Sequence, residues 1–236
     1  KIRSGVEWSD GMPWSVHDLA FTIEMLQRNA PRLNFSTDMK IWVDHVEVMD
    51  SLTATIHLTA PNPRFVFSYF TFNFGNGIHI VPRHIWDGQE VDSFTNYSSE
   101  TGSPIGTGPY VLANVTPQQR IWDLRDDWWA VRTGFHEPPV VERVIYLSNG
   151  DEVKWVQMIM SNQMDSSIDL RPANITALLD QNPNVTTWAG RTPPYGYRDW
   201  WPPSLGFNNQ EEPFSDSNVR WAINHALNRE EIIEIG

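Results

Sequence analysis

The sequence predicts a mixed α/β protein of the α+β kind, in which paired strands and helices occupy separate stretches of the chain. Alternation of apolar and polar residues predicts a β-hairpin between residues 46 and 58. Apolar residues spaced three and four apart predict helices before residue 30 and after residue 150. Strands and helices do not alternate regularly, which argues against a sheet built from repeated βαβ units.

The first helix is expected to follow a sharp turn. Residues 2–8 are predicted to form a strand, and the Asp, Gly and Pro of residues 10–13 each favour a turn. Ser15 fits a helix N-cap, and Asp18 three residues later completes a capping box. An apolar stripe then runs along the helix, formed by Val16, Leu19, Ala20, Ile23 and Leu26. The turn is therefore predicted to be structural and not catalytic.

The remaining elements follow in order along the chain. Residues 29–37 are expected to form a loop, and alternating residues on either side of "MDSLT" predict the hairpin. A polar loop over residues 87–103 leads to the best candidate for a domain boundary, at residues 103–109. Beyond it we expect strands within 104–115, 120–130 and 140–148, helices over 151–165 and 171–183, strands near 186–190 and 201–209, and a helix over 216–233 that restarts at an Asn228–Glu231 capping box.

Composition and charge exclude several classes of function. Of the 236 residues, 40% are hydrophobic and 12% aromatic, which is enough for a packed core. The formal net charge of −12 argues against nucleic acid and against an anionic membrane surface as partners. The chain contains no cysteine and no run of 18 apolar residues, so it has no disulfide and no predicted transmembrane helix.

No motif nominates a catalytic, metal-binding or cofactor-binding residue. The seven histidines include no HxH or HExxH pair, and the sequence has neither GxSxG nor GxxxxGK[ST]. Twelve tryptophans are many for this length, and we expect some of them to line a pocket or an interface.

Five stretches together resemble the family 5 extracellular solute-binding proteins, the receptors of oligopeptide, dipeptide and nickel ABC importers. They occur in the family's order over almost the whole chain: "GVEWSDGMPWSVHDLAFTIEML", "IVPRHIW", "PIGTGPYVL", "RDDWWA" and "LGFNNQEEPFSDSNVRWAINHALNREEII". The departures are mild, such as Trp14 in place of a small residue or Phe. The resemblance identifies the turn after residue 9 as a feature of the family's fold.

The resemblance implies a three-lobed receptor, periplasmic-binding-protein-like of type II, that closes on its ligand about a hinge. Residues 1–108 would form most of the small second lobe, without its first strands, and residues 109–236 the middle segment of the first lobe. The third lobe would lie outside this chain, which we therefore expect to be an internal piece of a longer protein.

The resemblance also implies partners and location. The receptor would be a monomer, periplasmic or extracellular, with any lipid anchor attached outside this chain. It would bind a peptide or an oligosaccharide and deliver it to the transmembrane subunits of an ABC permease. A carbohydrate-active enzyme, similar to a glycoside hydrolase, is the alternative, but no motif nominates the pair of carboxyl groups that hydrolysis needs. A receptor that regulates or signals is a third possibility.

Four aromatic residues are the candidates for ligand contact. Trp200 and Trp201 precede two prolines and the "SLGFNN" stretch, which resembles the family's strand entering the ligand cleft. Neighbouring side chains of an extended run face opposite ways, so we expect one Trp in the cleft and the other in the core. Phe35 and Trp42 are candidates for the opposing wall, because the family places an aromatic contact in roughly that loop.

Overall fold

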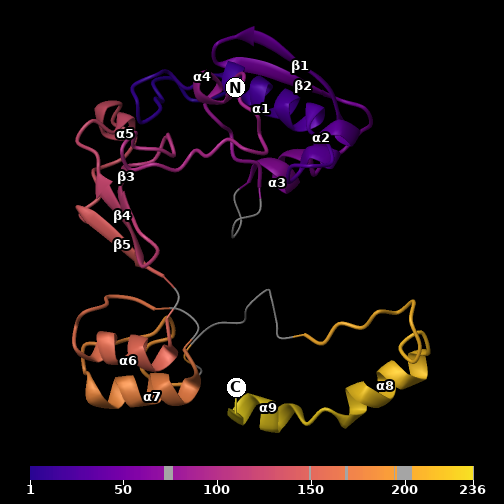
Figure 1. The fold of residues 1–236 in the computed structure, drawn as a ribbon, viewed down its shortest axis with the longest axis vertical. Helices are drawn as coiled ribbons and strands as arrows, with labels where there is room; N and C mark the ends of the chain where they lie inside the picture. Colours follow the sequence, from indigo (N-terminus) through magenta and orange to yellow (C-terminus); the bar gives the residue numbers. More distant parts are fainter. Residues whose placement is uncertain (72–76, 149, 168–169, 194, 196–203, 236) are drawn as a thin grey trace. The chain divides into compact units, whose positions relative to one another are not determined.

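The described chain divides into two compact units, Lys1–Ser148 and Asn149–Gly236 (Figure 1). The computed structural model describes all residues except 72–76, 149, 168–169, 194, 196–203 and 236, and the side chains of 233–235. The division at 148/149 differs from the boundary expected at residues 103–109. The assignment of residues 1–108 and 109–236 to two lobes therefore stays a prediction.

The first helix, α1 (Val16–Arg28), begins where the sequence predicts. The Ser15 hydroxyl accepts a hydrogen bond from the His17 N–H at 3.2 Å, and the Asp18 carboxylate accepts one from the Ser15 N–H at 2.9 Å. The predicted capping box is therefore confirmed. The apolar stripe of α1 places Ile23 and Leu26 in a buried cluster with Met39, Val43 and Phe65.

The second helix, α2 (Ser36–Trp42), lies partly in the stretch that is predicted to be a loop. Phe35 precedes it in the left-handed conformation, with φ of 61°, and makes no side-chain capping bond. A helix that starts without Ser, Thr, Asp or Asn as a cap gives no start signal in the sequence. The prediction is wrong for this reason, although residues 29–35 do form a connection.

The predicted hairpin is confirmed as β1 (Val43–Asp50) and β2 (Thr53–Leu58), which are antiparallel and pair Val46 with Ile56. Two short helices follow, α3 (Phe65–Phe70) and α4 (Arg83–Trp86). The predicted strand over residues 2–8 is wrong, because the backbone there makes only a bridge between Glu7 and Pro13. Pro13 has no N–H to continue a ladder, and α1 begins three residues later.

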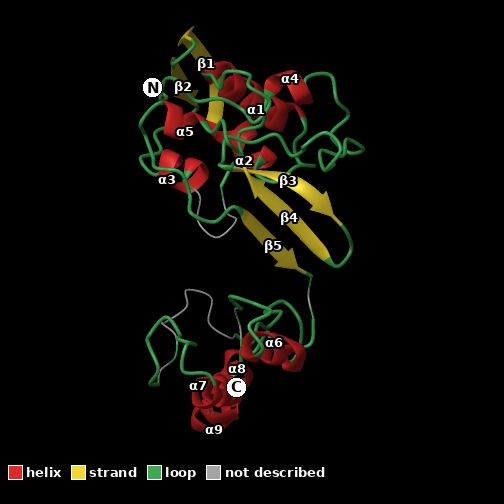
Figure 2. Ribbon diagram, turned by 90° about the vertical axis from the view of Figure 1, so that its left-hand side faces the viewer, coloured by secondary structure: helices red, strands yellow, loops and turns green. Residues whose placement is uncertain are grey.

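A three-stranded antiparallel sheet completes the first unit, as the sequence predicts. Its strands lie side by side in the order β3 (Tyr110–Val115), β4 (Gln119–Leu124) and β5 (Arg143–Leu147), as Figure 2 shows. The short helix α5 (Trp129–Arg132) lies between β4 and β5 in the chain. On one face of this sheet the Arg143 guanidinium donates two hydrogen bonds to Asp123, which hold the pKa of that carboxyl group below its ordinary value.

The second unit contains the predicted helices α6 (Glu152–Met160), α7 (Pro172–Gln181), α8 (Ser217–Ala226) and α9 (Arg229–Ile235). α6 is shorter than predicted, because Asn162 adopts a φ of 54° after the helix ends. The Asn228 side chain accepts a hydrogen bond from the Glu231 N–H, which confirms the predicted restart at α9. No helix in the described part of the chain is long and apolar enough to cross a membrane.

The two strands predicted late in the chain are wrong for the residues that the structure describes. Thr187 and Gly190 exchange both backbone hydrogen bonds in a tight turn, in which Gly190 has φ of 93°. Residues 204–208 carry no strand assignment. A strand requires a partner along its length, and the described residues of this unit offer none at either place.

Candidate functional site

Of the four residues that the sequence nominates for ligand contact, the structure describes two. Trp200 and Trp201 lie outside the described residues. Phe35 and Trp42 flank and end α2, where the Phe35 ring meets Tyr69 edge-on, with ring centroids 6.2 Å apart. The Trp42 ring packs, half-buried, against the core cluster of α1. The structure thus places Phe35 and Trp42 in the packing of the first unit, and their contact with a ligand stays a prediction.

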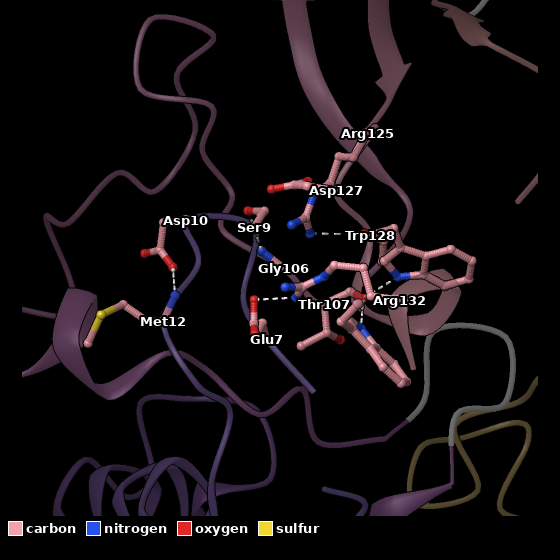
Figure 3. Close-up of polar contacts among 12 residues, drawn as sticks. Glu7, Ser9, Asp10, Met12, Gly106, Thr107, Arg125, Asp127, Trp128 and Arg132 are labelled. Atoms are coloured by element: carbon pink, nitrogen blue, oxygen red, sulfur yellow. Dashed lines mark hydrogen bonds and ion pairs between the residues drawn. The ribbon is translucent and has the colours of Figure 1, made fainter. Parts of the chain in front are cut away.

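The turn before α1 is held by its own hydrogen bonds (Figure 3). One Asp10 carboxylate oxygen accepts from the Met12 N–H at 3.1 Å, and the other lies 2.6 Å from Nε2 of His84. The Gly11 N–H donates to the Trp8 carbonyl at 3.0 Å, and Gly11 has φ of 86°. Asp10 therefore closes the turn and holds α4, and Gly11 adopts a positive φ that glycine accepts more readily than other residues.

Three stretches that carry the family resemblance meet beside this turn, at a contact that we call the turn junction. It comprises Glu7, Ser9, Gly106, Thr107, Trp128, Trp129 and Arg132, most of which are drawn in Figure 3. The Ser9 hydroxyl accepts from the Gly106 N–H at 3.2 Å, and Glu7 forms an ion pair with Arg132. These bonds join residues about a hundred positions apart in the sequence.

Two tryptophans share one acceptor at the turn junction. The indole nitrogen of Trp128 lies 3.0 Å from the Thr107 carbonyl oxygen, and that of Trp129 lies 2.7 Å from the same oxygen. A carbonyl oxygen has two lone pairs and can accept both bonds. Trp129 also forms a small buried cluster with Val6 and Ala130. The "GTG" stretch is thus held by side chains of a later segment.

A cavity of about 350 Å³ adjoins the turn junction within the first unit. Its walls are mainly apolar and include Val6, Trp8, Trp14, Phe70 and Ile78, with His79 and Thr107 among the residues that add polar groups. A volume of this size can hold a small ligand group. We call it the tryptophan cavity.

Trp8 is the most buried of the tryptophans that line the tryptophan cavity. The residue is 3% exposed, and its Nε1 is buried and has no hydrogen-bond partner in the described part of the chain. A buried donor without an acceptor costs about 1–3 kcal/mol. The sequence analysis did not nominate Trp8. In the sequence alone, a Trp next to a turn cannot be distinguished from an ordinary core residue.

The lining of the tryptophan cavity is mainly apolar, with His79 and Thr107 as its polar side chains and with no Asp, Glu, Ser or Lys among the described lining residues. Elsewhere among the described residues, no group of three or more His, Asp and Glu side chains could hold a metal ion. The apolar walls of the tryptophan cavity suit a hydrophobic ligand group.

Replacement of Gly11 tests the structural role of the turn. Gly11→Val should lower the free energy of unfolding by about 1 kcal/mol or more, because a β-branched residue is strained at positive φ. Apart from the two chain neighbours, no atom lies within 4 Å of an added Cβ, so a clash of the Cβ does not add to the backbone strain. Gly11→Asn, which tolerates this conformation, is the matched control and should lose less in urea denaturation. Equal losses for both variants would contradict this account.

Comparisons with known proteins agree over the whole length of the chain. A family model described as "Bacterial extracellular solute-binding proteins, family 5 Middle" matches residues 1–236. The glutathione-binding protein GsiB of Pectobacterium atrosepticum is 22% identical over 240 residues, which cover 100% of this chain and 41% of that protein. The chain therefore spans about two fifths of the length of this relative.

Solved structures share the fold. A periplasmic oligopeptide-binding protein of an ABC transporter from Thermotoga maritima matches with a TM-score of 0.78 and 23% identity, over 98% of this chain and 40% of that one. The oligopeptide-binding protein AppA from Bacillus subtilis matches with a TM-score of 0.71 and 20% identity, over 99% and 42%. Both likenesses extend through the first and second units.

Proposed function

Since this chain belongs to family 5 of the bacterial extracellular solute-binding proteins, we propose that it forms part of the substrate-binding receptor of an ABC importer. The receptor captures a peptide or an oligosaccharide outside the membrane and delivers it to the transmembrane permease subunits. The observation that carries this proposal is the match of the family model to every residue from 1 to 236. The lobes would be those that the resemblance implies, with the third lobe outside this chain.

Two solved relatives support the choice of ligand classes. The Thermotoga protein has been solved with mannohexaose bound, and the Bacillus protein in complex with a nonapeptide. The apolar walls of the tryptophan cavity suit either class, since both offer apolar surface. The receptor would act in the periplasm or outside the cell, as a monomer, with any lipid anchor carried outside this chain.

The alternative of a carbohydrate-active enzyme receives no support. The family is one of solute-binding proteins, and the described lining of the tryptophan cavity contains no carboxyl group. Hydrolysis of a glycoside needs two of them at a set separation. The third possibility is a receptor that regulates or signals. It would bind its ligand in the same way, and measurements of ligand transport distinguish it from the receptor of an importer.

The complete receptor and the 236-residue chain should differ in affinity. Titration calorimetry with defined oligopeptides and hexasaccharides should find a ligand for the complete receptor, and mass spectrometry should find that ligand chemically unchanged after incubation. The chain alone should bind it weakly or not at all, because half a cleft leaves most of the ligand surface in water. Hydrolysis of the ligand would contradict the proposed function. Equal affinities would contradict only the lobe assignment.

Trp200 and Trp201 remain our proposed aromatic contacts in the cleft. One of them would stack on a sugar ring or an apolar side chain, held still by the two prolines that follow. Replacing that Trp with Ala in the complete receptor should weaken ligand binding by about 1–3 kcal/mol, whereas replacing its neighbour should lower the melting temperature. If both variants melt early and neither binds less tightly, the pair is structural.

A further inference from the structure

A second hollow lies on the three-stranded sheet, away from the turn junction. It has a volume of about 660 Å³ and is lined by Tyr97, Tyr110, Arg120, Trp122, Val144 and Tyr146. We call it the aromatic hollow. Its volume is within the range of small-molecule sites, and four of its six lining residues are aromatic. The sequence analysis did not propose any of its lining residues as ligand contacts.

The strand register explains why these side chains gather on one face. Trp122 on β4 is paired with Val144 on β5, and Arg120 with Tyr146. Side chains two residues apart in a strand share a face, so all four project to the same side of the sheet. Tyr97, from the loop before β3, brings its ring to within 5.9 Å of the Arg120 guanidinium.

Of two polar side chains in the aromatic hollow, one makes a hydrogen bond within the protein and the other does not. The Tyr110 hydroxyl donates a hydrogen bond to the Val141 carbonyl at 2.8 Å. The Arg120 guanidinium makes no hydrogen bond and no ion pair with any residue that the structure describes, whereas Arg143, on the other face, donates twice to Asp123. Arg120 thus offers a planar fork of donors beside aromatic rings, and no carboxylate among the lining residues competes for it.

We propose that the aromatic hollow binds a pyranose ring of a neutral oligosaccharide. The apolar C–H face of a sugar ring packs on Trp122 and Tyr146, and the Arg120 fork donates to two neighbouring hydroxyl oxygens. A peptide would bring its ammonium group to a cation with no lining carboxylate, and only its carboxylate end would match the Arg120 fork, so a peptide control separates the two ligand classes. An acidic ligand is disfavoured by the net charge of −12. This inference goes beyond the proposed function, because it assigns a second binding site, on the three-stranded sheet of the first unit.

Saturation-transfer NMR and calorimetry on the 236-residue chain test this proposal, with mannohexaose, cellohexaose and maltohexaose as probes and penta-alanine as the peptide control. We expect at least one hexasaccharide to bind the chain weakly, with a saturation-transfer signal, and penta-alanine to give no signal. Tyr146→Ala should weaken binding at least tenfold, and this side chain is 61% exposed, so its loss should not unfold the sheet. Arg120→Lys should also weaken binding at least fivefold, because it keeps the charge but loses the fork.

Ile145→Ala is the matched control. It is the neighbour of Tyr146 on β5, is 50% exposed, and lies on the other face of the sheet. It should bind within twofold of the unchanged chain, and circular dichroism should give all three variants the same melting temperature. The proposal is overturned if no hexasaccharide binds, if Tyr146→Ala and Arg120→Lys bind normally, if Ile145→Ala weakens binding equally, or if penta-alanine binds in their place.

Discussion

Replacing Trp129 with Ala should lower the free energy of unfolding of the first unit by about 3–5 kcal/mol. The residue is 8% exposed and packs against Val6 and Ala130, so truncation leaves a cavity in a buried cluster. Its ring also stacks on Phe135, with centroids 5.5 Å apart and planes 13° apart. The substitution further removes a hydrogen bond to the Thr107 carbonyl. Packing is the larger part of the loss, because Trp128 still donates to that oxygen.

Urea denaturation followed by circular dichroism measures this loss. Trp129→Phe separates its two causes, because it keeps an aromatic ring and removes the N–H, and it should lose less than the Ala variant. Trp221→Ala is the control, since Trp221 is an exposed residue of α8 and its removal should cost less than about 1 kcal/mol. A loss below about 1 kcal/mol for Trp129→Ala would show that the turn junction does not hold the first unit together.

Asp18→Ala is the second substitution with a large expected effect, a loss of about 2–4 kcal/mol in the free energy of unfolding. Asp18 is 5% exposed, and its carboxylate accepts hydrogen bonds from the backbone N–H groups of Ser15 and Arg83, each at 2.9 Å. The substitution leaves both of these part-buried donors without their acceptor. It therefore weakens the start of α1 and releases α4 from α1 at the same time.

Two variants sharpen the measurement on Asp18. Asp18→Asn keeps one carbonyl oxygen as an acceptor and should lose less than Asp18→Ala in thermal and urea unfolding. Glu24→Ala is the matched control, because Glu24 lies exposed on the same helix and its removal should change stability by no more than about 0.5 kcal/mol. Similar losses for Asp18→Ala and Glu24→Ala would contradict the role that we assign to the Asp18 carboxylate.

Local signals in the sequence predicted the elements that local physics determines. Ser15 and Asp18 lie three residues apart and satisfy each other's donors, so a capping box can be predicted without any knowledge of the remaining chain. The hairpin β1–β2 follows equally from alternation and a short turn. Helix α2 was missed because Phe35 supplies no capping side chain, and the packing of Met39 in the core stabilises the helix instead.

The candidate sites depended on contacts that no local pattern specifies. The Ser9 hydroxyl meets Gly106 across 97 positions of sequence, and the Thr107 carbonyl meets two tryptophans more than 20 positions later. The unpaired donor of Trp8 depends on which residues surround it, and this is a property of the folded unit. The aromatic hollow arises from the register of β4 on β5, which sequence spacing alone does not set.

Ligand uptake by living cells is the measurement that tests the central claim most directly. The ligand identified by calorimetry on the complete receptor is isotopically labelled, and its accumulation is compared in cells with and without the gene for the receptor. The claim that this chain forms part of an importer's receptor predicts that deletion abolishes accumulation at ligand concentrations near the dissociation constant, and that a plasmid copy restores it. Unchanged accumulation in the deletion strain, with binding intact in the purified receptor, would contradict it.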